Sequence, residues 1–159
     1  MYFSLPQPQS VPWAGMPPGA LPVPPAADPS LISDIEKAID GQYSAIACYA
    51  RLLREAPAEP ARIIIEEIRN DEIRHYRTFV RIYTSLTGKT PTPKITETCP
   101  DDYREGLVAA FLDEQRTTHF YRRIADNARR PDIAEAFRRA AEDEQRHAVW
   151  FLYLLTGQR

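Results

Sequence analysis

The residues best suited to carry chemistry are two Glu-x-x-His motifs, Glu72 with His75 and Glu144 with His147. On a helix, a spacing of three residues puts both side chains on one face, so that they can bind one metal ion or a bridged pair. Carboxylate and imidazole form a ligand set suited to iron, manganese or zinc. One such motif is common by chance, but two motifs with a further glutamate, Glu114, between them indicate a metal site.

The two motifs belong to an internal repeat. A shift of 72 residues aligns like with like and needs no gap: Tyr49 with Tyr121, Asp71 with Asp143, Glu72 with Glu144, Arg74 with Arg146, His75 with His147 and Phe79 with Phe151. The same shift aligns Gln42 with Glu114. Because D-E-I-R-H and D-E-Q-R-H rarely occur by chance at matching places, we interpret the chain as a duplicated pair of helices.

The elements that position these residues are four amphipathic helices, expected at about residues 30–56, 60–87, 102–128 and 131–156 of a domain that spans 30–159. In each segment, apolar residues recur alternately three and four positions apart, on one stripe of a helix. The stretch from Gly88 to Asp102 is long enough, at about 3.3 Å per residue, to cross from one end of a bundle to the other. The sequence thus predicts an all-α fold, a ferritin-like four-helix bundle of two duplicated hairpins with a long crossover.

Polar and ionisable residues occupy the apolar stripes near the middle of these helices. The stripe positions concerned are Gln42, Glu72, His75, Glu114, Glu144 and His147. Burying several carboxylates together without partners is very costly, because burial disfavours each charge and the charges repel one another. Two divalent cations would remove this cost, so the sequence predicts that these six residues bind two metal ions. A bundle whose polar core residues bond only one another is the alternative.

Over residues 31–156 the sequence resembles the ferritin-like superfamily, in particular rubrerythrin-like and bacterioferritin-like di-metal carboxylate domains. The resemblance implies that Glu72 and Glu144 bridge the two metals. It makes His75 a terminal ligand of one metal and makes His147 and Glu114 terminal ligands of the other. It also implies that four charged residues of the D-E-x-R-H motifs hold the imidazoles in their metal-binding form: Asp71, Arg74, Asp143 and Arg146.

The activity that the resemblance implies is that of a non-haem di-metal oxidoreductase, which reduces peroxide or dioxygen and oxidises Fe(II). Its cofactors would be two divalent ions, with iron favoured and manganese or zinc as alternatives. Its catalytic residues would be Glu72, His75, Glu114, Glu144 and His147. The paired C-x-x-C motifs of a rubredoxin module are absent from the sequence, so electrons are expected from a separate donor protein. A homodimer is expected only because dimers are common in the family.

The sequence departs from the family pattern at two positions. Gln42 occupies the place of a glutamate, and a neutral amide is a poorer ligand for a hard cation. The metal next to His75 is therefore predicted to be held more weakly than its neighbour. Thr117 occupies the place of a further glutamate found in classical rubrerythrins. These departures leave open a second function, a non-catalytic metal-binding or structural interaction module with a degenerate site.

Several residues near these positions allow a second interpretation. Tyr49 and Tyr121 either hydrogen-bond the ligand carboxylates or are ordinary core tyrosines, and the arginines of the two motifs could be surface charges. His119 lies off the stripes and is expected to face solvent. Cys48 is expected to be a small core residue rather than a redox thiol.

Composition excludes several partners and favours a cytoplasmic protein. A net charge of −2 gives no reason to expect nucleic acid or an anionic membrane as partner. No apolar run approaches the roughly 18–20 residues of a membrane span, and the first thirty residues lack the Lys or Arg of a signal peptide. Two cysteines without a C-x-x-C pattern suit a reducing compartment. Residues 1–29 are rich in proline and are predicted to be an extended or disordered arm.

Overall fold

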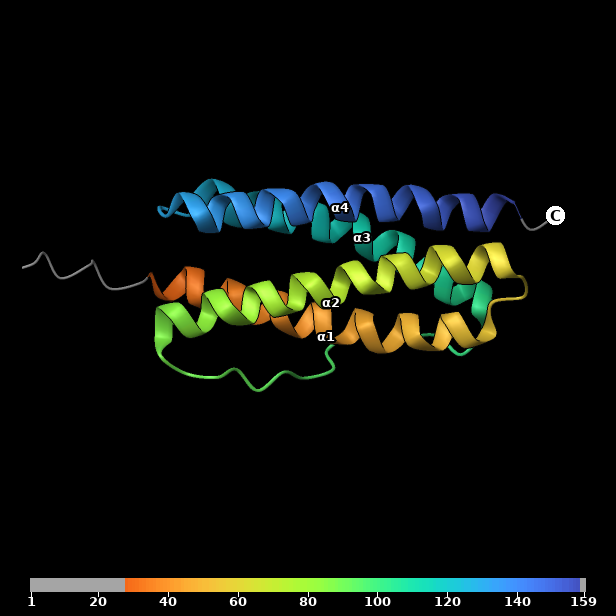
Figure 1. Cartoon of the computed structure of the whole chain (residues 1–159), viewed down its shortest axis with the longest axis horizontal. Helices are drawn as coiled ribbons and strands as arrows, with labels where there is room; N and C mark the ends of the chain where they lie inside the picture. Colours follow the sequence, from red (N-terminus) through yellow and green to blue (C-terminus); the bar gives the residue numbers. More distant parts are fainter. Residues whose placement is uncertain (1–27, 158–159) are drawn as a thin grey trace, which may run out of the picture.

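The computed structural model describes residues 28–157 and consists of four long helices. They are α1 (Pro29–Glu55), α2 (Glu59–Thr87), α3 (Tyr103–Asn127) and α4 (Pro131–Thr156). Figure 1 shows that all four run along the long axis of the molecule. The prediction of an all-α four-helix bundle is confirmed. The arm predicted at residues 1–29 lies, apart from its last two residues, outside the described part of the chain.

The helix ends follow from local chemistry. Asp28 accepts a hydrogen bond from the backbone N–H of Ser30 at 2.9 Å, so α1 begins at Pro29, inside the predicted arm. Gly88 ends α2 with a φ of 68°, a left-handed conformation that glycine adopts without strain. Asp102 starts α3 by accepting from the N–H of Glu105 at 2.9 Å. No helix within residues 28–157 is both long and apolar enough to span a membrane.

The helices pack as two hairpins, α1 against α2 and α3 against α4, and contacts between α1 and α3 and between α2 and α4 join the hairpins. At Gly106 the approach of α3 to α1 is so close that a Cβ atom would lie 2.6 Å from Cδ2 of Leu52. A larger residue at Gly106 would therefore push the two hairpins apart or force Leu52 to move.

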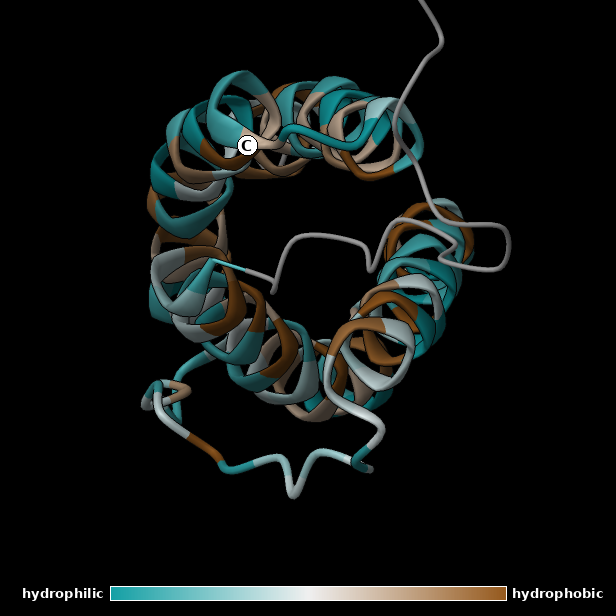
Figure 2. Cartoon of the chain, turned by 90° about the vertical axis from the view of Figure 1, so that its left-hand side faces the viewer, coloured by the Kyte–Doolittle hydropathy of each residue, from teal (hydrophilic) through white to brown (hydrophobic). Residues whose placement is uncertain are grey.

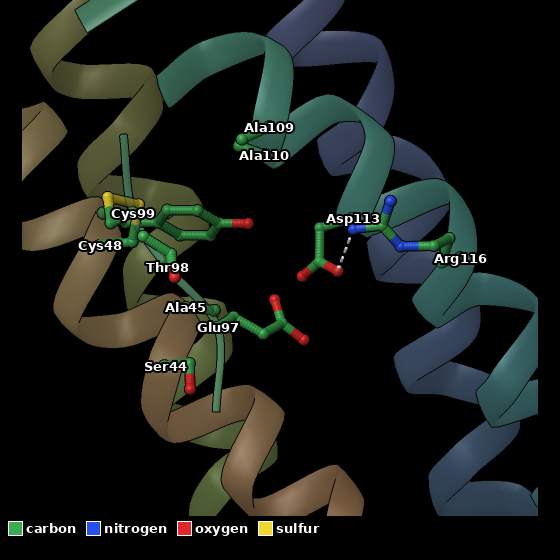
Figure 3. Close-up of a pocket in the computed structure, with 11 residues that line it drawn as sticks. Ser44, Ala45, Cys48, Glu97, Thr98, Cys99, Ala109, Ala110, Asp113 and Arg116 are labelled. Carbon is green, nitrogen blue, oxygen red and sulfur yellow. Dashed lines mark hydrogen bonds and ion pairs between the residues drawn. A yellow bond between two sulfur atoms is a disulfide. The ribbon is translucent and has the colours of Figure 1, made fainter. Parts of the chain in front are cut away.

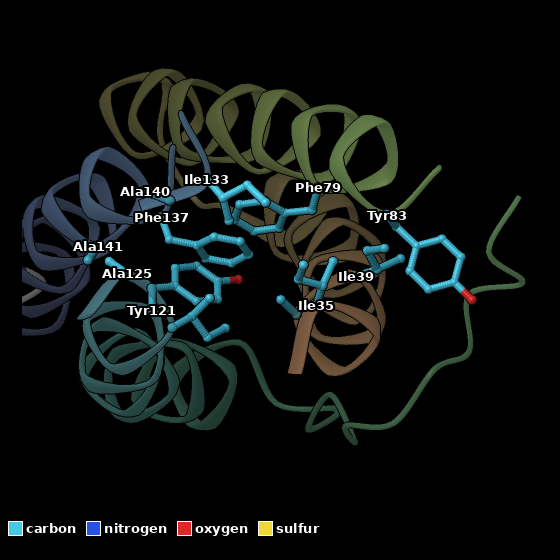
Figure 4. Close-up of a cluster of buried hydrophobic side chains, with 12 residues drawn as sticks. Ile35, Ile39, Phe79, Tyr83, Tyr121, Ala125, Ile133, Phe137, Ala140 and Ala141 are labelled. Atoms are coloured by element: carbon cyan, nitrogen blue, oxygen red, sulfur yellow. The ribbon is translucent and has the colours of Figure 1, made fainter. Parts of the chain in front are cut away.

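Two apolar clusters fill the bundle, one on each side of its middle. In the first, Phe79 and Phe137 stack with ring centroids 4.2 Å apart, and Tyr121 packs edge-on against Phe79 (Figure 4). The second contains Leu52, Ile65 and Phe151. The two clusters exclude water from both ends of the short polar segment that separates them.

The crossover of residues 88–102 lies outside the ring of helices (Figure 2), and it is hydrogen-bonded along one side of α1. Asp40 accepts a hydrogen bond from the N–H of Lys94 at 2.9 Å, and Ser44 accepts from the N–H of Thr96 at 2.9 Å. Asp40 and Ser44 are four residues apart, so they share one face of the helix. The crossover predicted from the sequence is thus held against α1 and covers part of the bundle.

A disulfide joins Cys48 of α1 to Cys99 of the crossover, with Cα atoms 5.4 Å apart. The expectation that Cys48 is a simple core residue is therefore wrong. The physical reason is the path of the crossover, which brings Cys99 onto the face of α1 that carries Cys48. Because structural disulfides are typical of oxidising compartments, the cysteines no longer support a cytoplasmic location, which stays a prediction.

Candidate metal centre

All four helices contribute to the polar segment between the two apolar clusters. The six predicted residues are at most 5% exposed: Gln42 from α1, Glu72 and His75 from α2, Glu114 from α3, and Glu144 and His147 from α4. Four of them offer ligand atoms that all lie within 4.8 Å of one another: Glu72, Glu114, Glu144 and His147. The bundle thus brings the predicted residues together at one buried point.

Two carboxylates lie between the two imidazoles. Glu72 Oε1 is 2.9 Å from Nδ1 of His147, and its Oε2 is 3.4 Å from Nδ1 of His75. Glu144 has the same division, with Oε2 3.6 Å from Nδ1 of His147 and Oε1 3.3 Å from Nδ1 of His75. Each carboxylate therefore turns one oxygen toward each imidazole, which is the arrangement needed to bridge two ions.

Several buried ligand atoms at this point make no hydrogen bond. The atoms are Gln42 Oε1, Glu72 Oε1, Glu114 Oε2 and His147 Nδ1. Leaving a buried acceptor unsatisfied costs about 1–3 kcal/mol, and more when the group is charged. The distance of 2.9 Å between Glu72 and His147 is short, but the two groups are not aligned as donor and acceptor. Oxygen and nitrogen lone pairs that converge without donors are what a divalent cation satisfies, so the residues fit a metal site.

The two halves of the centre differ because the repeat has Glu114 in one half and Gln42 at the equivalent position of the other. Glu114 accepts a hydrogen bond from the Tyr49 hydroxyl at 2.7 Å. At the equivalent place, the amide nitrogen of Gln42 donates to the Tyr121 hydroxyl at 2.9 Å and to Glu144 Oε1 at 3.3 Å. The half next to His75 therefore has one negative charge fewer and holds an N–H group close to a candidate bridging oxygen.

The outer nitrogen of each imidazole pairs with the aspartate of the opposite motif. Nε2 of His147 lies 3.2 Å from Oδ2 of Asp71, and Nε2 of His75 lies 3.0 Å from Oδ2 of Asp143. A carboxylate at Nε2 favours the proton on that nitrogen and leaves Nδ1 free to face the centre. Each histidine of α2 or α4 therefore pairs with the aspartate of the other helix, in keeping with the symmetry of the repeat.

Two arginines tie the aspartates together. Arg146 donates to Asp71 at 2.7 Å and pairs with Asp143 at 2.9 Å, and Arg74 donates to both of the same aspartates. The guanidinium groups are more than half exposed, yet each contacts both aspartates. They are surface residues that also position the carboxylates behind the imidazoles.

The electrostatic environment couples proton and metal binding. Burial, together with the charges of Glu144 and Glu72, raises the pKa of Glu114 well above its usual value. Burial lowers the pKa of His75, but hydrogen bonds with Asp143, Glu144 and Glu72 outweigh it and raise the pKa to about 11. A hydrogen bond from His147 holds the pKa of Asp71 well below its usual range. A proton and a metal ion therefore compete for the same imidazole nitrogen.

A small cavity of about 60 Å³ reaches the centre from the face between α1 and α3. Thr117 lines this cavity, whereas His119 is exposed on the outside of α3, as expected. Glu97 and Asp113 also line it, although neither was predicted from the sequence as a site residue. The available signals were the position of Asp113 next to Glu114 and the fact that Glu97 is the sole acidic residue between Gly88 and Pro100.

The chain is similar to a protein family model, to a bacterial protein and to a solved structure. The rubrerythrin family model matches residues 105–158, which carry Glu114, Glu144 and His147. The chain is 53% identical over 134 residues to the uncharacterized protein YhjR of Bacillus subtilis (strain 168), which covers 84% of this chain and 92% of YhjR. It also resembles the solved structure of hypothetical protein Pfu-1136390-001 from Pyrococcus furiosus. That likeness has a TM-score of 0.67, covers 86% of this chain and 94% of that one, and at 17% identity it shows a shared fold alone.

Proposed function

Since the chain belongs to the rubrerythrin family of ferritin-like proteins, we propose that it is a non-haem di-metal oxidoreductase. Iron is the favoured metal, and manganese or zinc would suit the same ligands. The proposed reaction is the reduction of peroxide or dioxygen coupled to the oxidation of Fe(II). The electrons would come from a separate donor protein.

The observation that carries this proposal is the convergence, on one point between two apolar clusters, of buried ligand atoms that make no hydrogen bond. A structural role alone gives no reason to bury three glutamates together, because mutual repulsion and desolvation oppose it. A pair of divalent cations offsets these charges, and the division of Glu72 and Glu144 between two imidazoles supports two ions rather than one.

In this proposal the chain's own residues would hold and orient the ions. Glu72 and Glu144 would be shared by the two ions, His75 would hold one of them, and His147 with Glu114 would hold the other. Tyr49 fixes the orientation of Glu114 through its hydrogen bond to Oε1, which leaves Oε2 for the ion. When bound, the ions supply Lewis acidity and the capacity to change oxidation state. The apolar clusters keep bulk water away from them.

A second function, a non-catalytic module that holds a single structural ion, is favoured by one observation. The Gln42 amide nitrogen donates to Glu144 on the side of His75, and a donor there opposes the binding of a cation. The half with His147 and Glu114 would then bind one ion, and the other half would be closed by hydrogen bonds.

Metal stoichiometry separates the two functions. The purified chain is incubated anaerobically with Fe(II), Mn(II) or Zn(II), desalted and measured for metal per chain by elemental mass spectrometry. Two irons per chain, followed by oxygen-dependent absorbance in the near ultraviolet, would support the oxidoreductase. One tightly held ion without oxidation would support the module, and no metal under any condition would contradict both.

The Gln42→Glu variant provides a second test of the same choice. It restores the fourth carboxylate and removes the amide donor next to Glu144. A gain in Fe(II) oxidation and in stoichiometry would indicate an enzyme weakened at one position. If Gln42→Glu stays inactive with one ion per chain, the module is the better description.

A further inference from the structure

A second, larger cavity adjoins the small one on the face between α1 and α3. It has a volume of about 320 Å³ and opens beneath the crossover (Figure 3). Four residues line both cavities: Ala45, Tyr49, Glu97 and Asp113. The two cavities therefore adjoin, and the inner one is lined by Gln42 and Glu114 of the buried centre.

Two carboxylates face each other where the cavities meet. Figure 3 shows the side chains of Glu97, from the crossover, and Asp113, from α3, pointing toward one another across the opening. Partial burial and the charge of Asp113 raise the pKa of Glu97 to about 7, because the two carboxylates repel one another. A cation placed between them would relieve this repulsion.

Nearby cations do not neutralise the pair. Arg116 lies 3.1 Å from Asp113 and offsets one of the two charges. Lys37, which lines the inner cavity, is 3.4 Å from Asp34 and is engaged there. With Glu97 ionised, the opening therefore keeps a net negative charge.

The inner cavity holds unsatisfied acceptors. Gln42 is 2% exposed and its Oε1 has no hydrogen-bond partner, and Glu114, also 2% exposed, has a free Oε2. Both side chains line the cavity that also contains Glu97 and Asp113. A cation that enters at the carboxylate pair would thus meet buried oxygen ligands directly behind it.

The opposite approach to the centre has no net negative charge to attract a cation. The cavity on the face between α2 and α4, beside His75, is lined by Arg74 and Arg139. Its acidic residues are Glu142 and Asp143, and Asp143 is already paired with Arg74 and Arg146. Electrostatic steering therefore favours entry on the face between α1 and α3.

We propose that Glu97 and Asp113 form the entrance through which a divalent cation reaches the buried centre, an inference that rests on the proposed metal site. The disulfide between Cys48 and Cys99 holds Glu97 in place, since Cys99 follows it by two residues and is bonded to α1. The entrance binds a cation in passing and is not one of its final ligands. It controls how fast the ion arrives and leaves, but not how tightly it is held.

The test is the rate of Co(II) uptake, followed by stopped-flow visible absorbance as the ion exchanges water for protein ligands. The variants are Glu97→Gln and Glu97→Lys, both at an exposed side chain. The matched control is Glu142→Gln, which removes one carboxylate from the cavity on the opposite face. We expect Glu97→Lys to slow uptake at low salt by about tenfold or more, with a smaller effect for Glu97→Gln. The difference should shrink as salt is added.

The equilibrium measurement separates an entrance from a ligand. Changing an entrance slows uptake and release alike, so the dissociation constant of Glu97→Gln should stay within about threefold of the native value. A weaker equilibrium affinity with an unchanged uptake rate would make Glu97 a ligand and overturn the entrance. Native rates in both Glu97 variants, or an equal slowing in Glu142→Gln, would also overturn it. If the native chain binds no Co(II) at all, the metal site itself is wrong, which is a different result from native binding with unaffected variants.

Discussion

At the scale of single residues, the internal repeat supplies its own controls. Tyr49 and Tyr121 occupy equivalent places, are both buried, and differ in their partner. Tyr49 donates to the carboxylate of Glu114, whereas Tyr121 accepts from the neutral amide of Gln42. The same fold therefore contains a charged and a neutral version of one hydrogen bond.

Replacing each tyrosine by phenylalanine should reveal this difference. Hydrogen bonds to charged groups contribute about 1.5–3 kcal/mol, and neutral ones about 1 kcal/mol. At a pH above the raised pKa of Glu114, where that carboxylate is charged, Tyr49→Phe should therefore lower the free energy of unfolding of the metal-free chain more than Tyr121→Phe does, as measured by urea denaturation. An equal or larger loss for Tyr121→Phe would contradict the assignment of the two partners.

The aspartates behind the imidazoles allow a second paired comparison. Asp71 contacts His147, and Asp143 contacts His75. Loss of such a partner typically lowers metal affinity by about 10- to 100-fold. Asp71→Asn should weaken the ion held by His147 and Glu114, whereas Asp143→Asn should weaken the ion next to His75. Titration calorimetry with Zn(II) resolves the two affinities, and a variant that weakens both ions equally would argue against separate half-sites.

At the scale of elements, the crossover is a structural part of the site. Hydrogen bonds from the N–H groups of Lys94 and Thr96 to Asp40 and Ser44, together with the disulfide, fasten it to α1. It thereby brings Glu97 to the opening opposite Asp113 (Figure 3). A loop that only connected the two hairpins would need none of these attachments.

Removing the disulfide should cost stability chiefly through the unfolded chain. The two cysteines are 51 residues apart in sequence, and a closed loop of that size is worth about 4 kcal/mol in the chain-entropy account. The double variant Cys48→Ser, Cys99→Ser should therefore unfold at a lower urea concentration than the oxidised native chain. Reductant should lower the native midpoint and leave the variant unchanged. A native midpoint that does not respond to reductant would show that the bond does not form.

The sequence predicts the helices and the centre far better than the crossover. Periodic apolar residues and the position of Glu72, Glu114 and Glu144 on the same stripes require the helices to converge on one point. The disulfide and the role suggested for Glu97 depend on the path of an irregular segment. No periodicity constrains that path, so spacing alone could not place Cys99 on Cys48.

At the scale of the whole molecule, the bundle buries its mutually repelling glutamates between its two apolar clusters. The apolar clusters around Phe79 and around Phe151 bring the helices together, and the buried glutamates oppose this in the segment between them. Metal binding should therefore be coupled to folding, because the unfolded chain has no preformed site. Ion binding to the folded chain alone adds stability as free metal rises above the dissociation constant, by about 2.7 kcal/mol at a hundredfold excess.

Because one half of the repeat has Gln42 where the other has Glu114, the coupling between metal binding and folding can be measured separately for each half. In increasing Mn(II) or Zn(II), the midpoint of thermal unfolding should show two rises, a first one and then a steeper one, because each bound ion adds stability that grows with the logarithm of free metal. The first belongs to the half with Glu114 and His147, and the second, at higher metal, belongs to the half with Gln42 and His75. In Gln42→Glu the second rise should move to lower metal concentration, because the added carboxylate makes the halves alike. Its metal-free midpoint should fall, because a fourth carboxylate is then buried among the other three. A single rise in the native chain would mean that the bundle holds one ion, and a higher metal-free midpoint in Gln42→Glu would refute the repulsion that makes a cation necessary.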